Sequence, residues 1–192
     1  AMAATAACYA NKVRVEDIRV GLSSFFPSPT QMPGRMNIIP IRHFDVMVDY
    51  GHNPKAFANL FDLVGRLDYK RRLLVLDAVG DRRDQDIEEL AAIAARGADE
   101  VILYEDTDLR GRKKGEIVAV LEQGFAKAGF PRDRLVTIMD EWEAISAALD
   151  RGRPGDLIVY MTGRVRKAIQ FIYEYKEKKD PLSVPRAEVD GI

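Results

Sequence analysis

From about residue 36 onward, apolar residues recur in two alternating patterns. Short β-branched or apolar runs, typical of strands, are separated by longer stretches in which apolar residues return every three or four positions, as on one face of a helix. The predicted strands are 36–41, 44–48, 72–78, 100–104, 135–139 and 156–161, and the predicted helices are 54–67, 84–96, 115–128, 141–149 and 163–175. This alternation predicts an α/β, Rossmann-like fold with a mainly parallel sheet and helices on both faces.

The first 34 residues follow a different pattern. Residues 1–11 are rich in alanine, and residues 15–24 carry Ile18 and Leu22 on one helical face, so both segments predict helices. Segment 26–34 holds three prolines and one glycine, which predicts an extended linker. We therefore expect a helical segment with its linker at 1–34, an α/β domain at 35–176 and a flexible charged tail at 177–192.

Composition narrows the classes of function. The 29 basic and 30 acidic residues leave a net charge of −1, which is not the basic excess that binds nucleic acid or anionic lipid. One cysteine and two histidines offer few ligands for a transition metal. The longest apolar runs are far shorter than the ~20 residues that span a bilayer. We expect a cytoplasmic protein without nucleic-acid partners, membrane partners or a metal site of its own.

Three predicted strand ends carry polar clusters, and ligands bind at the carboxyl ends of strands in such sheets. The first cluster places Asp49, Tyr50, His52 and Asn53 at a strand-to-helix turn. A carboxylate there can accept from a ribose hydroxyl, and an aromatic ring can stack on a base. A cap for the helix that begins at Pro54 would explain one polar residue, but not four in sequence.

The other two clusters suit charged ligands. In 79–84, Arg82 and Arg83 can bind anionic oxygens, although a solvated helix start is the simpler interpretation. In 105–112, Asp106 and Asp108 suit an ammonium or guanidinium group and Arg110 suits a carboxylate, so an amino acid would match both. A solvated loop with internal ion pairs explains that segment equally well.

Familiar triphosphate-binding motifs are absent from the sequence. Gly124 and Gly129 have the glycine spacing of a P-loop, but the lysine and hydroxyl that should follow are missing. No Gly-x-Gly-x-x-Gly follows any predicted strand. Residues 162–164 end the last strand and form a weaker fourth candidate site.

Three stretches in combination resemble the C-terminal domain of the Mur ligases: Pro-Gly-Arg-Met-Asn at 33–37, Asp-Tyr-Gly-His-Asn-Pro at 49–54 and Gly-Asp-Arg-Arg at 80–83. Segments 80–87 and 105–113 are most similar to the Mur-ligase-like portion of the cyanophycin synthetases. The resemblance extends over about residues 1–175. It implies a Rossmann-like C-terminal domain, preceded by the last helices of a central ATPase domain.

The resemblance also implies an activity. In this family a carboxylate is phosphorylated by ATP, and the amine of an incoming amino acid attacks the acyl phosphate. The partners would be ATP, the amino acid, an acceptor carboxylate on a peptide or polymer, and the central domain, which would carry the P-loop and the Mg²⁺ ligands. No catalytic residue is expected here, so the isolated chain should be inactive.

Site residues follow by position. The expected nucleotide-binding residues are Arg35, Asp49, Tyr50, His52 and Asn53, and the expected substrate-binding residues are Arg82, Arg83, Asp106, Asp108, Arg110 and Arg112. One departure concerns segment 162–167, which is basic where a cyanophycin synthetase would be acidic, and this fits a carboxylate-bearing or polyanionic partner better than free arginine. The alternatives are a free-standing nucleotide-binding or regulatory module without catalysis, and an interaction domain that binds no small molecule.

Overall fold

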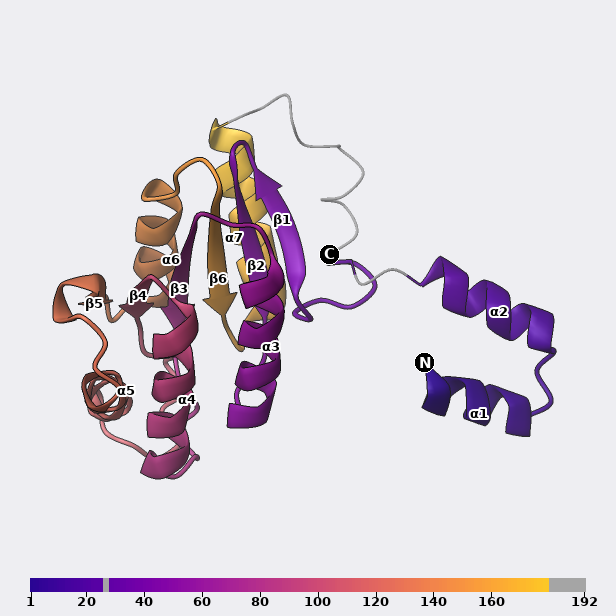
Figure 1. Ribbon diagram of the computed structural model, residues 1–192, viewed down its shortest axis with the longest axis horizontal. Helices are drawn as coiled ribbons and strands as arrows, with labels where there is room; N and C mark the ends of the chain where they lie inside the picture. Colours follow the sequence, from indigo (N-terminus) through magenta and orange to yellow (C-terminus); the bar gives the residue numbers. More distant parts are fainter. Residues whose placement is uncertain (26–27, 180–192) are drawn as a thin grey trace.

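The computed structural model describes residues 1–25 and 28–179, so most of the predicted tail, 177–192, lies outside the described residues. The centre of the protein is a six-stranded sheet in the order β1-β2-β6-β3-β4-β5 (Figure 1). Its strands are β1 (Asn37–Ile41), β2 (Phe44–Asp49), β3 (Arg71–Leu76), β4 (Glu100–Leu103), β5 (Leu135–Thr137) and β6 (Asp156–Met161). Only the β1–β2 pair is antiparallel; every other neighbouring pair is parallel. The predicted Rossmann-like, mainly parallel sheet is confirmed.

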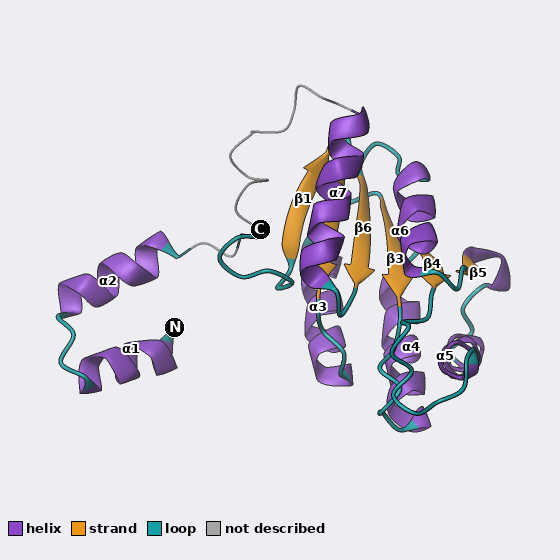
Figure 2. Ribbon diagram, turned by 180° about the vertical axis from the view of Figure 1, so that it is seen from behind, coloured by secondary structure: helices purple, strands orange, loops and turns teal. Residues whose placement is uncertain are grey.

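Helices cover both faces of the sheet (Figures 1 and 2). One face carries α3 (Pro54–Arg66), α4 (Asp84–Gly97) and α5 (Glu116–Lys127), and the other carries α6 (Glu141–Asp150) and α7 (Val165–Lys179). A short 3₁₀ turn, η1 (Arg132–Arg134), precedes β5. Along β3, Leu74 and Leu76 pack with the first set of helices, whereas Leu73 and Val75 pack with the second. Burial on both faces explains why this strand is continuously apolar.

Helix α7 is longer than the sequence pattern predicts. The prediction ended the helix at 175, but α7 continues to Lys179. Lys176 is only 8% exposed, so its aliphatic stem packs against the domain. Lysines in the last turn also complement the negative end of the helix dipole. The start of the charged segment predicted as tail is therefore helical.

At the amino end of β3, one arginine joins three strands. Arg71 donates to Asp156 at the start of β6 and, at 2.8 Å, to Glu100 at the start of β4. It also donates to the carbonyl of Arg151, again at 2.8 Å. The Arg71 and Asp156 side chains are 14% and 3% exposed. This network fixes the amino edge of the sheet, opposite the edge where the candidate site lies.

The two predicted N-terminal helices are present as α1 (Met2–Ala10) and α2 (Val15–Ser24), and they contact each other. Large apolar side chains on and beside them are exposed to solvent: Met2, Tyr9, Val13, Val15, Val20, Leu22 and Phe25. None of the helices in the described ranges combines the length and apolar character needed to cross a bilayer.

Candidate functional site

The end of the linker is hydrogen-bonded to the turn after β2. The carbonyl of Gly34 accepts from the Tyr50 N–H at 2.9 Å, and the Asp49 carboxylate accepts from the N–H groups of Met36 at 2.8 Å and Gly51 at 2.6 Å. Asp49 is only 8% exposed. Both of its oxygens therefore hold the backbone of this turn in shape.

These bonds bring three predicted nucleotide-binding residues together. The guanidinium carbon of Arg35 lies 5.5 Å from the centre of the Tyr50 ring, a cation–π distance. The rings of Tyr50 and His52 meet edge to face with centres 4.8 Å apart, and His52 Nδ1 lies 3.1 Å from the Tyr50 carbonyl oxygen. Tyr50 is 39% exposed. The result is an aromatic and cationic surface at the carboxyl end of β2.

Asn53 caps helix α3: its Oδ1 accepts from the Ala56 N–H at 2.9 Å, and Pro54 occupies the first helical turn. Replacing Asn53 with alanine removes the oxygen that accepts from the Ala56 N–H and leaves this N–H without a partner in the helix. We therefore expect the free energy of unfolding to fall by about 1 kcal/mol. Urea unfolding measures the change. Asn53→Ser, which keeps a capping oxygen, should stay close to the parent protein, and equal losses in both variants would contradict the capping role.

The loops after β3 and β4 are joined to each other. A Cβ on Gly80 would lie 2.2 Å from the carbonyl oxygen of Leu109, so only glycine allows this approach. Arg112 donates to the carbonyls of Gly80 at 2.7 Å and Arg82 at 2.6 Å, and it pairs with Asp84 at 2.7 Å. Its side chain is 14% exposed. Arg112, predicted to bind substrate, is thus engaged by the protein's own backbone.

The remaining predicted substrate-binding residues separate into two groups. Arg110 bridges Asp81 at 3.1 Å and Asp108 at 3.3 Å, with all three side chains substantially exposed. Arg82 lies 3.7 Å from Asp81, and Arg83 pairs with Asp86 on α4 at 2.7 Å. Asp106 belongs instead to a second cluster, where it accepts from Arg164 at 2.7 Å. The structure brings the two loops together, but it does not place all six side chains at one point.

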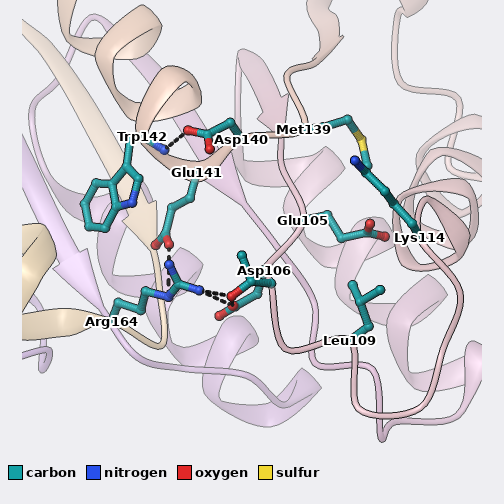
Figure 3. Close-up of a pocket in the computed structure, with 10 residues that line it drawn as sticks. Glu105, Asp106, Leu109, Lys114, Met139, Asp140, Glu141, Trp142 and Arg164 are labelled. Atoms are coloured by element: carbon teal, nitrogen blue, oxygen red, sulfur yellow. Dashed lines mark hydrogen bonds and ion pairs between the residues drawn. The ribbon is translucent and has the colours of Figure 1, made fainter.

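The second cluster consists of Asp106, Glu141 and Arg164, and it borders a cavity of about 380 Å³ (Figure 3). Apolar side chains of Leu109, Met139 and Trp142 form part of its wall. In Figure 3 the Arg164 guanidinium lies between the two carboxylates, and dashed lines run to both. Sequence reasoning marked Arg164 only as part of a weak fourth strand end, and it missed Glu141.

Glu141 is the most buried member of this cluster, with its side chain 4% exposed. Its Oε1 accepts from the hydroxyls of Tyr160 at 2.7 Å and Thr162 at 2.6 Å. Its Oε2 has no hydrogen-bond donor among the described residues and lies 3.5 Å from Nε of Arg164. One carboxylate oxygen is therefore directed at the cation without a close hydrogen bond.

Asp77, directly after β3, was also missed. It lines a small hollow of about 40 Å³ between the turn after β2 and the end of β6, together with Tyr50, His52 and Thr162. Burial raises the pKa of Asp77 to about 8; the nearby carboxylates of Asp106 and Glu141 add to the rise, and hydrogen bonds from the backbone of Ala78 and Asp106 oppose it. Its Oδ1 has no partner in the described structure.

The pKa of Asp106 is shifted in the opposite direction. Burial pushes its pKa upward, but the Asp108 N–H and the guanidinium of Arg164 outweigh that effect, so the pKa lies below the ordinary value. The carboxyl edge of the sheet thus combines one carboxyl group that favours its neutral form with an ion pair a short distance away.

The structure is a doubly wound α/β sheet with polar loops gathered at its carboxyl edge, which is the edge where sheets of this class bind their ligands. Residues 34–164 match the family described as Mur ligase, glutamate ligase domain, and the chain belongs to this family.

Individual relatives agree with this assignment. The chain is 36% identical over 172 residues to a cyanophycin synthetase of Trichormus variabilis, covering 90% of this chain and 19% of that one. A solved UDP-N-acetylmuramoyl-L-alanyl-D-glutamate–2,6-diaminopimelate ligase is similar with a TM-score of 0.59 and 27% identity, over 75% of this chain and 30% of that one. Mycobacterium tuberculosis folylpolyglutamate synthase, solved with ADP and AMPPCP, shares the fold with a TM-score of 0.63 and 19% identity, over 83% and 35%. The chain spans about a fifth of the length of the cyanophycin synthetases it matches.

Proposed function

We propose that this chain is the C-terminal domain of an ATP-dependent ligase that joins a carboxylate to the amine of an amino acid. In this proposal the domain closes over ATP held mainly by a central domain, in the cytoplasm, where ATP is supplied. The family membership and the names of the relatives support the class of reaction. The exposed apolar side chains of α1 and α2 suit helices that are the last elements of that central domain and pack against the rest of it.

The nucleotide side of the site is the surface formed by Arg35, Tyr50 and His52. Arg35 supplies a cation, and the two rings supply flat faces and edges for an adenosine group. Asp49 and Asn53 support this surface from behind, because their side-chain oxygens hold the turn and the start of α3. This is half of a nucleotide pocket, as expected of a domain that closes over a ligand bound elsewhere.

The amino-acid side of the site is the pair of joined loops after β3 and β4. Arg82, Arg83 and Arg110 can bind a carboxylate, and Asp108 can bind an ammonium group. Arg112 keeps the two loops in register. Asp106 lines the cavity that would receive the side chain of the amino acid.

In the reaction, ATP phosphorylates the acceptor carboxylate, and the amine then displaces phosphate from the acyl phosphate to form an amide. This chain contributes orientation and exclusion of water as it closes. Within the described residues, no group of three or more His, Cys, Asp and Glu is arranged to hold a metal ion. The proposal therefore assigns the Mg²⁺ ligands to the central domain, and the acceptor is a peptide or polymer carboxylate.

The test uses the full-length protein and follows phosphate release from ATP in the presence of acceptor and amino acids. Tyr50→Ala and His52→Ala should each lower kcat/KM for ATP about tenfold or more, because each removes a ring from the nucleotide surface. His43→Ala is the matched control, since His43 precedes β2 at the opposite edge of the sheet and is exposed. Its activity should equal that of the parent.

The isolated chain gives the complementary result. It should show no turnover and only weak nucleotide binding by calorimetry. Turnover by this chain alone would contradict the division of labour between domains. Tight ATP binding that is lost in His52→Ala, with no ligase activity in the full-length protein, would support a nucleotide-binding module instead.

A further inference from the structure

Arg164 occupies an acidic pocket of its own protein. Its Nη2 donates to Asp106 Oδ1 at 2.7 Å and also to the hydroxyl of Thr107, and its Nε faces Glu141 Oε2 at 3.5 Å (Figure 3). The Arg164 side chain is 29% exposed, whereas Glu141 is 4% exposed. The guanidinium therefore contacts one buried carboxylate, Glu141, and one partly exposed carboxylate, Asp106.

The pocket has the chemistry of a cation site. Two carboxylates at one end suit a guanidinium or ammonium group, and the apolar wall of Leu109, Met139 and Trp142 suits an aliphatic stem. Glu141 Oε2, buried and without a hydrogen-bond donor among the described residues, is directed at the position where such a group sits. In this protein the position is taken by the side chain of Arg164.

Helix energetics alone do not account for this placement. Arg164 comes directly before α7, and a cation at the amino end of a helix is disfavoured by the helix dipole. The next arginine, Arg166, lies in the first turn of the same helix and is exposed. What distinguishes Arg164 is its contact with the two carboxylates.

We infer that Arg164 is a specificity-determining residue that fills the acidic pocket and excludes amino acids with positively charged side chains. This inference rests on the proposed function, because it treats the cavity beside the joined loops as the side-chain pocket of the incoming amino acid. A cationic side chain would have to displace Arg164 or lie beside it. Either arrangement costs free energy in a partly buried site, where like charges repel more strongly than in bulk water. Neutral side chains meet no such barrier, whereas a carboxylate-bearing side chain would also meet Glu105 and Asp140, which line the same cavity.

The first experiment measures binding of methylguanidinium to this chain by calorimetry, with N-methylurea as the neutral probe. Arg164→Ala should bind methylguanidinium about tenfold or more tightly than the parent, because two unpaired carboxylates become accessible. Arg166→Ala should bind like the parent. Adding Glu141→Gln to Arg164→Ala should abolish the gain, and N-methylurea should show none.

Three results would overturn the inference: equal methylguanidinium binding by the parent and Arg164→Ala, the same gain in Arg166→Ala, or a gain that survives Glu141→Gln. Arg164→Gln is a control for misfolding of Arg164→Ala, since it keeps most of the side-chain stem and removes the charge. It should also bind methylguanidinium more tightly than the parent, and its failure to do so would count against the inference.

The second experiment uses the full-length protein. If it ligates neutral amino acids but not lysine or arginine, and Arg164→Ala gains activity with a cationic amino acid, the specificity role is supported. Turnover of lysine or arginine by the parent would overturn the specificity role while leaving the ligase function intact. Absence of ligation with every amino acid would overturn the proposed function, and the methylguanidinium result would then stand by itself as evidence on the pocket.

Discussion

Asp77→Asn is expected to stabilise this protein at pH 8 by about 5 kcal/mol, while leaving its stability near pH 4 almost unchanged. The carboxyl group of Asp77 ionises near 3.8 when unfolded, but burial, with the charges of Asp106 and Glu141, raises its pKa in the fold to about 8. Between these values the folded state binds a proton that the unfolded state has lost. Stability contributed by the neutral carboxyl is therefore complete below pH 4 and is lost as the pH rises towards 8.

Urea unfolding of the parent and Asp77→Asn from pH 4 to pH 8 tests this expectation. Because asparagine cannot ionise, the free energy of unfolding of the variant should change less with pH than that of the parent. Asp68→Asn is the control, since Asp68 is exposed and its replacement should leave the slope of the parent unchanged. Parallel profiles for the parent and Asp77→Asn would show that Asp77 is ionised in the fold throughout this range.

Arg71→Ala is expected to lower the free energy of unfolding by about 3 kcal/mol. The substitution leaves the Asp156 carboxylate buried, at 3% exposure, without its cation, and it also removes the bonds to Glu100 and to the Arg151 carbonyl. The Arg153 N–H still donates to Asp156 at 2.8 Å, which limits the loss. Thermal and urea unfolding should both detect the change.

The comparison variant is Arg66→Ala. Arg66 pairs with Asp62 at 2.7 Å, but their side chains are 73% and 65% exposed, so the expected loss is at most about 0.5 kcal/mol. Similar losses in the two variants would mean that burial does not determine how much the Arg71 network contributes to the free energy of unfolding.

The strands and helices of the α/β domain could be predicted because their apolar patterns are strong. The run at 72–78 reads as a strand buried on both faces, and β3 packs its side chains alternately into the two cores. The strand order could not be predicted in the same way. Insertion of β6 between β2 and β3 depends on contacts between residues far apart in the chain, and no local pattern encodes them.

The candidate site was predicted in part. The turn at 49–54 was identified because four polar residues in sequence exceed what a helix cap requires, and Arg35, Tyr50 and His52 do lie together. Their role with a nucleotide stays a prediction. The sequence pattern does not distinguish Asp77, because this residue continues an apolar run and is predicted to be part of the strand. A charged residue at the end of such a run was the signal that could have identified it.

Glu141 was missed for a different reason. An acidic residue in the first turn of a helix is common and favourable, so nothing in the sequence separates Glu141 from the exposed Glu143. Only the fold shows that Tyr160, Thr162 and Arg164 gather around it. For Arg112 the sequence predicted a role that the structure does not require. Its position suggested a contact with a ligand, but its guanidinium already donates to two backbone carbonyls.

The hydrogen bonds between the linker and the turn after β2 restrict where a hinge can lie. Gly34 and Met36 are fastened to Tyr50 and Asp49, so residues from 34 onward belong to the rigid body of the sheet. Any pivot relative to a preceding domain must therefore act upstream of Gly34. Arg35 then travels with Tyr50, and the two side chains would reach or leave a nucleotide in a single motion.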